Sequence, residues 1–152
     1  MPTIRLPTLV IICLALVAVI AFMIMALLQA NRLDDSAQEL AIAATLDAFQ
    51  AEYPRLLIEN SHPNFQTIFP SAELLRYLEN TKRILGPLSS LTTIRGSTDI
   101  AGISRGQSSS SAEFEINLEF QNTPAIVNIT METLDDRWLI TAFRLSADLL
   151  RS

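Results

Sequence analysis

Residues 112–120 read AEFEINLEF, and apolar and polar side chains alternate without exception along this stretch. In a β-strand such a sequence places every apolar residue on one side and every polar residue on the other. A strand of this kind belongs to a sheet with one face against a core and one face in solvent. The sequence predicts two further strands, at 125–134 and 137–150, joined by turns at Asn122–Pro124 and Asp135–Asp136.

The residues before these strands have the periodicity of helices. Four residues recur at the spacing of one helical stripe: Ile42, Leu46, Phe49 and Tyr53. This first helix is expected either to begin at a cap within residues 34–36 or to continue the preceding apolar segment as one stiff helix, since no Gly or Pro lies between Pro7 and Pro54. It is expected to end or kink at Pro54. Residues 55–69 are expected to form a short helix and a loop around His62. A further helix, residues 71–85, is closed by Gly86 and Pro87.

Helices followed by consecutive strands predict an α+β domain in which helices pack on a curved antiparallel sheet of three to four strands. Residues 88–96 form the first expected strand, and 97–104 form either a second short strand or its continuation. The polar segment 105–111 is expected to be a loop. We expect the stripe of the first helix to cover the apolar face of residues 114–120.

Residues 7–28, PTLVIICLALVAVIAFMIMALL, are almost wholly apolar, and no charged residue occurs from Leu6 to Asn31. As a helix, this stretch spans about 33 Å, which matches the roughly 30 Å hydrocarbon core of a bilayer. A cleaved signal peptide is the alternative, but the run exceeds the usual apolar region of roughly 7–15 residues. The predicted organisation is a short tail (1–6), a transmembrane helix (7–29) and an extramembrane domain (30–152).

The basic residues near this segment bear on its orientation. Arg5 and the amino terminus precede it, whereas Arg32 follows it beside two aspartates, which count little in the positive-inside rule. The balance favours an N-terminus in the cytoplasm and an extracytoplasmic, periplasmic domain.

The composition argues against several classes of function. The chain has a formal net charge of −5 and no basic stripe, which makes nucleic acid an improbable partner. With four glycines, it contains neither a phosphate-binding loop nor a dinucleotide-binding glycine pattern. The only histidine is His62 and the only cysteine is Cys13, so neither a catalytic triad nor a metal site is expected. Asp47 is the one acid within the apolar part of the first helix, and we expect it on the solvated side rather than as a general base.

Five residues are candidates for binding a partner. Glu113, Glu115 and Glu119 line the polar side of the strand at 112–120, where they serve either as solubility and edge protection or as a docking surface for a basic protein. In the apolar segment, Ala15 and Ala18 belong to a series of small residues that would let another membrane helix approach closely.

The order of elements resembles that of nuclear-transport-factor-2-like domains over residues 36–148. Small bacterial members commonly close a helix with Leu-Gly, as Leu85 and Gly86 do here, and end with a polar turn, a Trp and alternating apolar residues, as residues 135–143 do. Ala142-Phe143 stands where many members have Gly-Tyr. The resemblance implies a cone-shaped α+β fold whose curved sheet wraps a long first helix.

The chain is also similar to the cytochrome oxidase assembly factor 1 family. The shared features are a single N-terminal span, a Leu-Gly-Pro-like helix exit at Leu85–Pro87, and a final strand with Trp138. About 40 residues separate the span from the second helix here, more than that family leads us to expect.

Both resemblances imply a non-catalytic, membrane-anchored accessory, scaffold or assembly subunit without a cofactor. It would contact the bilayer through residues 7–29 and bind subunits of a membrane protein complex. The alternative is a tethered binding domain that holds a small apolar ligand inside the cone of sheet and helix.

Overall fold

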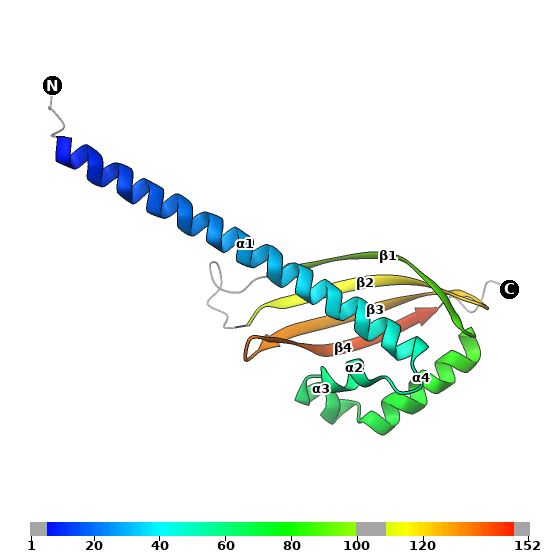
Figure 1. The fold of residues 1–152 in the computed structure, drawn as a ribbon. Coiled ribbons are helices and arrows are strands. Elements are labelled where there is room, and N and C mark those ends of the chain that lie inside the picture. Colours follow the sequence, from blue (N-terminus) through cyan, green and yellow to red (C-terminus); the bar gives the residue numbers. More distant parts are fainter. Residues whose placement is uncertain (1–5, 100–108, 148–152) are drawn as a thin grey trace. The chain divides into compact units, whose positions relative to one another are not determined.

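The computed structural model describes residues 6–99 and 109–147, with the side chains of the first helix described from Leu14 onward. The helices are α1 (Leu6–Gln50), α2 (Arg55–Glu59), α3 (Pro63–Ile68) and α4 (Ser71–Leu85). The strands are β1 (Leu88–Asp99), β2 (Ser111–Phe120), β3 (Pro124–Leu134) and β4 (Arg137–Ala147). This confirms the predicted α+β class, with one long apolar helix at the N-terminus (Figure 1).

The chain divides into two compact units, residues 1–33 and residues 34–152. In the first unit, α1 is long and apolar enough to cross a membrane. Its large apolar side chains from Leu14 to Leu28 are between 48% (Ile20) and 73% (Phe22) exposed. This surface is apolar on every side, as in a helix that crosses a membrane.

We expect this segment to be retained in the mature protein. Its apolar run is longer than the core of a signal peptide, and LLQA before Asn31 offers a peptidase no small-x-small site. N-terminal sequencing of protein purified from membranes should therefore find a chain that still contains residues 7–29. A mature chain that begins near Asn31 would contradict the prediction.

In the second unit, the four strands form one antiparallel sheet with the order β1-β2-β3-β4. Residues 88–99 are a single strand, so residues 97–99 continue the first predicted strand, and the remainder of the 97–104 stretch lies outside the described residues. The Asp135–Asp136 turn has positive φ at both residues (49° and 60°), as a tight two-residue hairpin requires. The predicted loop at 105–111 lies mostly outside the described residues.

Three irregularities in strand pairing alter the simple alternation of side chains. The β1–β2 register shifts twice, and the half-buried residues of β1 there recur every third position, at Leu88, Leu91 and Ile94. The β3–β4 register shifts between Thr130 and Met131. Bulges of this kind add a residue to one strand and increase its twist, which curves the sheet.

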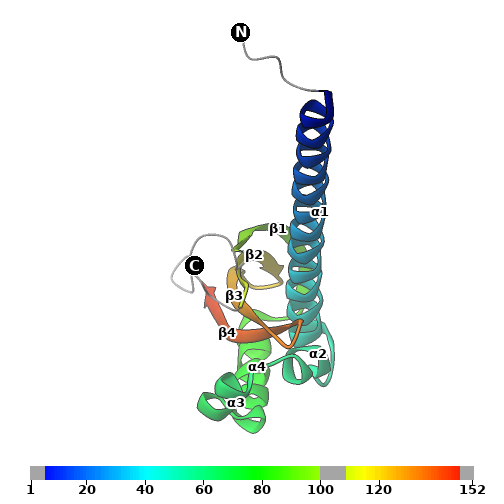
Figure 2. The same ribbon diagram turned by 90° about the vertical axis from the view of Figure 1, so that its left-hand side faces the viewer.

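The inner face of the sheet forms the core of the domain. Figures 1 and 2 show the part of α1 after Asp34 lying along this face. The buried side chains of β2 are Ala112, Phe114, Ile116, Leu118 and Phe120, each at most 5% exposed. Those of β3 and β4 are Ala125, Val127, Ile129, Met131, Trp138, Ile140 and Phe143. The expectation that residues 114–120 supply core side chains is confirmed.

A helix start at residues 34–36 is wrong, because α1 runs without a break from Leu6 to Gln50, as the alternative of one continuous helix predicts. The predicted stripe of α1 is also wrong in part. Phe49 is buried, but Ile42 and Leu46 are only half-buried, and Tyr53 lies beyond the helix end and is 54% exposed. The fully buried positions are instead Ala37, Ala41, Ala44, Thr45 and Ala48. They lie about a third of a turn from the predicted stripe. Small side chains let the helix backbone approach a sheet face that already carries four aromatic rings.

Three contacts between α1 and the sheet define how the helix lies on it. Near the beginning of the domain, Asp34 Oδ1 accepts a hydrogen bond of 2.6 Å from Thr98 Oγ1, and the indole Nε1 of Trp138 donates to Ser36 Oγ at 3.1 Å. At the other end, the ring of Phe49 packs edge-on against Phe120, with centroids 5.1 Å apart. These contacts bring together residues up to 102 positions apart in sequence.

Thr45 combines complete burial with an unsatisfied hydroxyl. Its Oγ1 finds no hydrogen-bond partner within the part of the chain that the structure describes. We expect Thr45→Val to raise the free energy of unfolding by about 1–2 kcal/mol, because valine has the same shape without the buried hydroxyl. Thr45→Ser is the control: it keeps the hydroxyl, loses a methyl group and should lower stability. Denaturant unfolding followed by Trp138 fluorescence measures both, and a destabilising Thr45→Val would contradict the prediction.

The segment between α1 and α4 closes one edge of the sheet. Ser61 forms a parallel bridge with Ile140 of β4, where Ile140 N–H donates to Asn60 O (2.7 Å) and His62 N–H donates to Ile140 O (2.8 Å). The imidazole Nδ1 of His62 accepts the Asn64 N–H at 3.1 Å, which caps α3. The expected short helix and loop are therefore two short helices, with His62 as the cap of the second.

The end of α4 is fixed as the sequence predicts. Gly86 has φ of 79°, a conformation that glycine adopts without strain. The β2–β3 turn then satisfies the end of the helix, since Asn122 donates its N–H to Leu85 O (3.0 Å) and its side-chain amide to Ile84 O (2.9 Å).

Candidate interaction surface

The outer face of the sheet is its side opposite α1. None of its side chains on β2, β3 and β4 is buried, and none of the described helices covers it in Figure 1 or Figure 2. Its members on the first two strands are Arg95, Ser97, Asp99, Glu113, Glu115, Asn117 and Glu119. Those on the other two are Pro124, Ile126, Asn128, Thr130, Glu132, Leu134, Arg137, Leu139, Ala142, Arg144 and Ser146.

Strand register assembles a polar row across the middle of this face. Arg95 lies opposite Glu115, Glu115 opposite Asn128, and Asn128 opposite Arg144. Neighbouring strands are about 4.8 Å apart, so adjacent members of the row are within reach of one another. In the next row, the side-chain amide of Asn117 donates to Thr93 Oγ1 at 2.9 Å, which joins β1 to β2.

The outer face is acidic on balance. Five carboxylates, those of Asp99, Glu113, Glu115, Glu119 and Glu132, stand against the guanidinium groups of Arg95, Arg137 and Arg144. The difference is two negative charges, which gives the face a field that attracts cations and repels anions.

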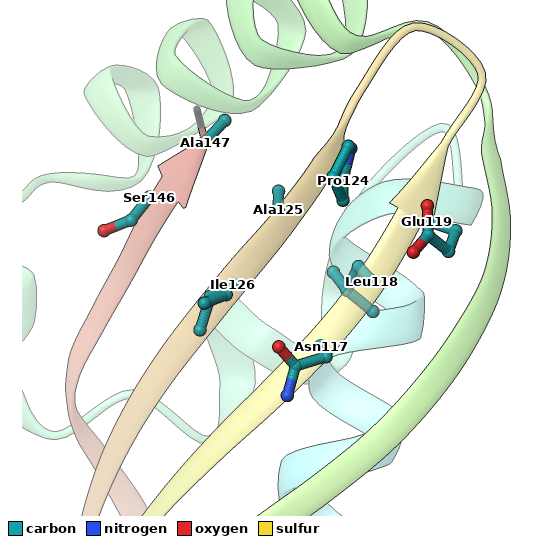
Figure 3. A pocket seen from close by; sticks show the side chains of 8 residues that line it. All are labelled: Asn117, Leu118, Glu119, Pro124, Ala125, Ile126, Ser146 and Ala147. Atoms are coloured by element: carbon teal, nitrogen blue, oxygen red, sulfur yellow. The ribbon is translucent and has the colours of Figure 1, made fainter. Parts of the chain in front are cut away.

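Two hollows occur at this face. The polar hollow has a volume of about 390 Å³ and is lined mostly by polar atoms of Arg95, Gly96, Ser97, Glu113, Glu115 and Asn128. The apolar hollow has a volume of about 500 Å³ and is lined mostly by apolar atoms of Asn117, Leu118, Glu119, Pro124, Ala125, Ile126, Ser146 and Ala147 (Figure 3). The face therefore offers a depression of each chemical character.

The inner face, by contrast, is filled by the protein's own side chains. Phe114, Ile116, Leu118, Phe120, Trp138 and Phe143 would line a ligand cavity in the cone, yet each is at most 7% exposed. The ring of Phe49 packs against both Phe120 and Phe143, at centroid distances of 5.1 and 6.2 Å. A ligand between helix and sheet would have to displace these contacts.

The structure places the predicted partner-binding residues in two groups. Glu113, Glu115 and Glu119 share the outer face, with Glu115 half-buried and the other two exposed. Ala15 and Ala18 are exposed on the apolar part of α1, in the other unit of the chain.

Asp47 has a structural contact that the sequence did not reveal. It is half-buried, and its Oδ2 accepts a hydrogen bond of 2.7 Å from the N–H of Leu56 in α2. Neither tyrosine of the chain is placed as its partner, since Tyr53 is exposed and Tyr77 packs edge-on against Phe69. Asp47 therefore ties the end of α1 to the segment that follows.

Arg55 and Glu59 form an ion pair on α2. The pKa of Arg55 is raised above its usual value by a hydrogen bond from its Nε to Glu59 (2.6 Å) and by the charge of that carboxylate. Both side chains are more than half exposed, so the pair contributes little to stability.

Within residues 6–99 and 109–147, no three His, Cys, Asp or Glu residues gather in a way that could hold a metal ion.

Several residues of the outer face could not be identified from the sequence. Alternation shows that Asn128 and Arg144 point away from the core, but not that they lie beside Glu115. The β3–β4 register shift makes this pairing harder still to foresee. In the sequence, Arg95 is a single charged residue within a polar strand, and this does not indicate which side chains lie beside it.

No protein-family model, no curated protein and no solved structure matches this chain. The resemblances to nuclear-transport-factor-2-like domains and to the cytochrome oxidase assembly factor 1 family therefore stay predictions.

Proposed function

We propose that the protein is a non-catalytic, membrane-anchored accessory subunit that binds another membrane protein through the outer face of its sheet. The observation that carries the proposal is the uncovered outer face, with its polar row and two hollows. Exposed apolar surface rimmed by polar residues is a common feature of protein interaction sites, and the apolar hollow with the polar side chains around it supplies such a surface here. The domain would lie outside the cytoplasm, as the charges around the span favour.

The packing of the inner face supports this proposal over the tethered ligand carrier. A carrier of small apolar molecules needs a concave site that encloses most of the ligand. Here the side chains that would line it are packed against Phe49 and its neighbours in α1. A partner on the outer face requires no rearrangement of the core.

Photo-crosslinking in native membranes tests the proposed surface. A photoreactive residue in place of Asn128, at the centre of the outer face, should yield a cross-linked product of one defined mass. The same residue in place of Arg76, exposed on α4, should not yield that product. Equal products from both positions, or none from Asn128, would remove the outer face as the binding surface.

We expect the apolar segment of α1 to contribute to the same assembly. Its alanines permit a close approach of another helix, which an all-leucine surface does not. Replacing residues 7–29 with polyleucine should therefore weaken copurification with the cross-linked protein, while membrane insertion and Trp138 fluorescence stay unchanged. Undiminished copurification would show that the segment is only a tether.

A further inference from the structure

We infer, on the basis of the proposed function, that the partner presents an amphipathic basic segment to the outer face. Its lysine or arginine side chains would lie over β2, and its apolar side chains over β3 and β4. The occupant is thus a segment of another membrane protein rather than a lipid surface, a small ligand or a second copy of this chain.

The two halves of the outer face differ in chemistry. On β2, Glu113, Glu115 and Glu119 form a line of carboxylates about 20 Å long. On β3, Pro124 and Ile126 line the apolar hollow, and Ala142 and Leu139 of β4 add apolar surface farther along the sheet, opposite Thr130 and Glu132. One strand spacing separates the halves, a distance that the two sides of one helix or strand can bridge.

The polar hollow is the place on the acidic half where a cationic side chain of the partner would bind. Glu113 and Glu115 both line it, and its volume is about 390 Å³. Arg95 lines it as well, so one positive charge already stands at its rim. A second cation placed between the two glutamates would still have a carboxylate on each side, the arrangement that strengthens charge-assisted hydrogen bonds.

Charge also argues against the other occupants. A second copy packed face to face would bring another five carboxylates and only three guanidinium groups against the same numbers here. Like charges in an interface oppose association and select against that partner. An anionic membrane surface is repelled for the same reason.

The test uses the full chain in native membranes, with the photoreactive residue in place of Asn128. The face variant is Glu113→Lys/Glu115→Lys/Glu119→Lys, and the matched control is Glu52→Lys/Glu73→Lys/Glu79→Lys, which has the same charge change at exposed positions outside the outer face. We expect the cross-link to fall at least about tenfold in the face variant and to change less than about twofold in the control. Trp138 fluorescence melts confirm that both variants fold.

Mass spectrometry of the cross-linked peptide provides the second measurement. The inference expects a partner segment with at least two Lys or Arg residues, and their reversal to Glu should restore the cross-link to the face variant. A segment without Lys or Arg, or an undiminished cross-link in the face variant, overturns the inference and leaves the proposed function standing. Absence of any cross-link from Asn128 in the otherwise unchanged chain overturns both.

Discussion

Replacing Gly96 with valine is expected to destabilise the domain by about 3 kcal/mol or more. A Cβ atom at this position would collide with the carbonyl oxygen of Glu113 and would lie 2.8 Å from the Cα of Phe114, both on the paired strand. These are backbone atoms, so they cannot move aside as a flexible side chain would. To accommodate the new atom, β1 would have to separate from β2 at the centre of their regular pairing.

Ser97→Val is the matched control for this substitution. Ser97 follows Gly96 in the same strand but is exposed on the outer face, so the same side chain should change stability by less than about 1 kcal/mol there. Trp138 is the only tryptophan of the chain and is 7% exposed, so its fluorescence reports the unfolding of this domain in the full protein. Equal stabilities for the two variants would mean that β1 is not held against β2 as described.

Replacing Leu118 with alanine is expected to lower the free energy of unfolding by about 2–5 kcal/mol. Leu118 is 1% exposed on the inner face, where it lies opposite Leu91 and Ala125 on the neighbouring strands. Ala125 is too small to fill the space left by the deleted atoms, so a cavity would remain. The loss then includes both the transfer free energy of the side chain and the cost of that cavity.

Leu134→Ala provides the comparison for Leu118→Ala, because it deletes the same atoms from a residue that is 43% exposed at the end of β3. Its effect should be under about 1 kcal/mol. Denaturant titration monitored by Trp138 fluorescence measures both variants. An unchanged midpoint for Leu118→Ala would indicate that the inner face, rather than the outer face, is open to a partner.

Local patterns in the sequence were sufficient for most of the fold. The alternation in 112–120 correctly predicted which side chains of β2 are buried, because side-chain direction in a strand depends only on position. Gly86 and the Asp135–Asp136 pair marked a helix end and a hairpin turn, because the backbone conformations needed there suit few residues. The apolar run from residue 7 to residue 28 predicted a helix able to span a membrane by length and hydropathy alone.

The buried face of α1 was not predictable in the same way. Apolar residues occur on several sides of this helix, and the large ones, Ile42 and Leu46, attracted the prediction. The sheet already supplies the bulky side chains, so the helix packs with its alanines inward. This choice depends on the volumes of two surfaces that meet only in the folded domain.

The sequence by itself determined the α+β class, the apolar N-terminal helix, and the inward and outward sides of β2. The tertiary structure alone decided that Arg95, Glu115, Asn128 and Arg144 form one row, and that the outer face carries a polar and an apolar hollow. Side-chain direction follows from the local backbone, whereas neighbours across a sheet follow from register. Register is fixed by bulges and turns that couple residues far apart in the chain.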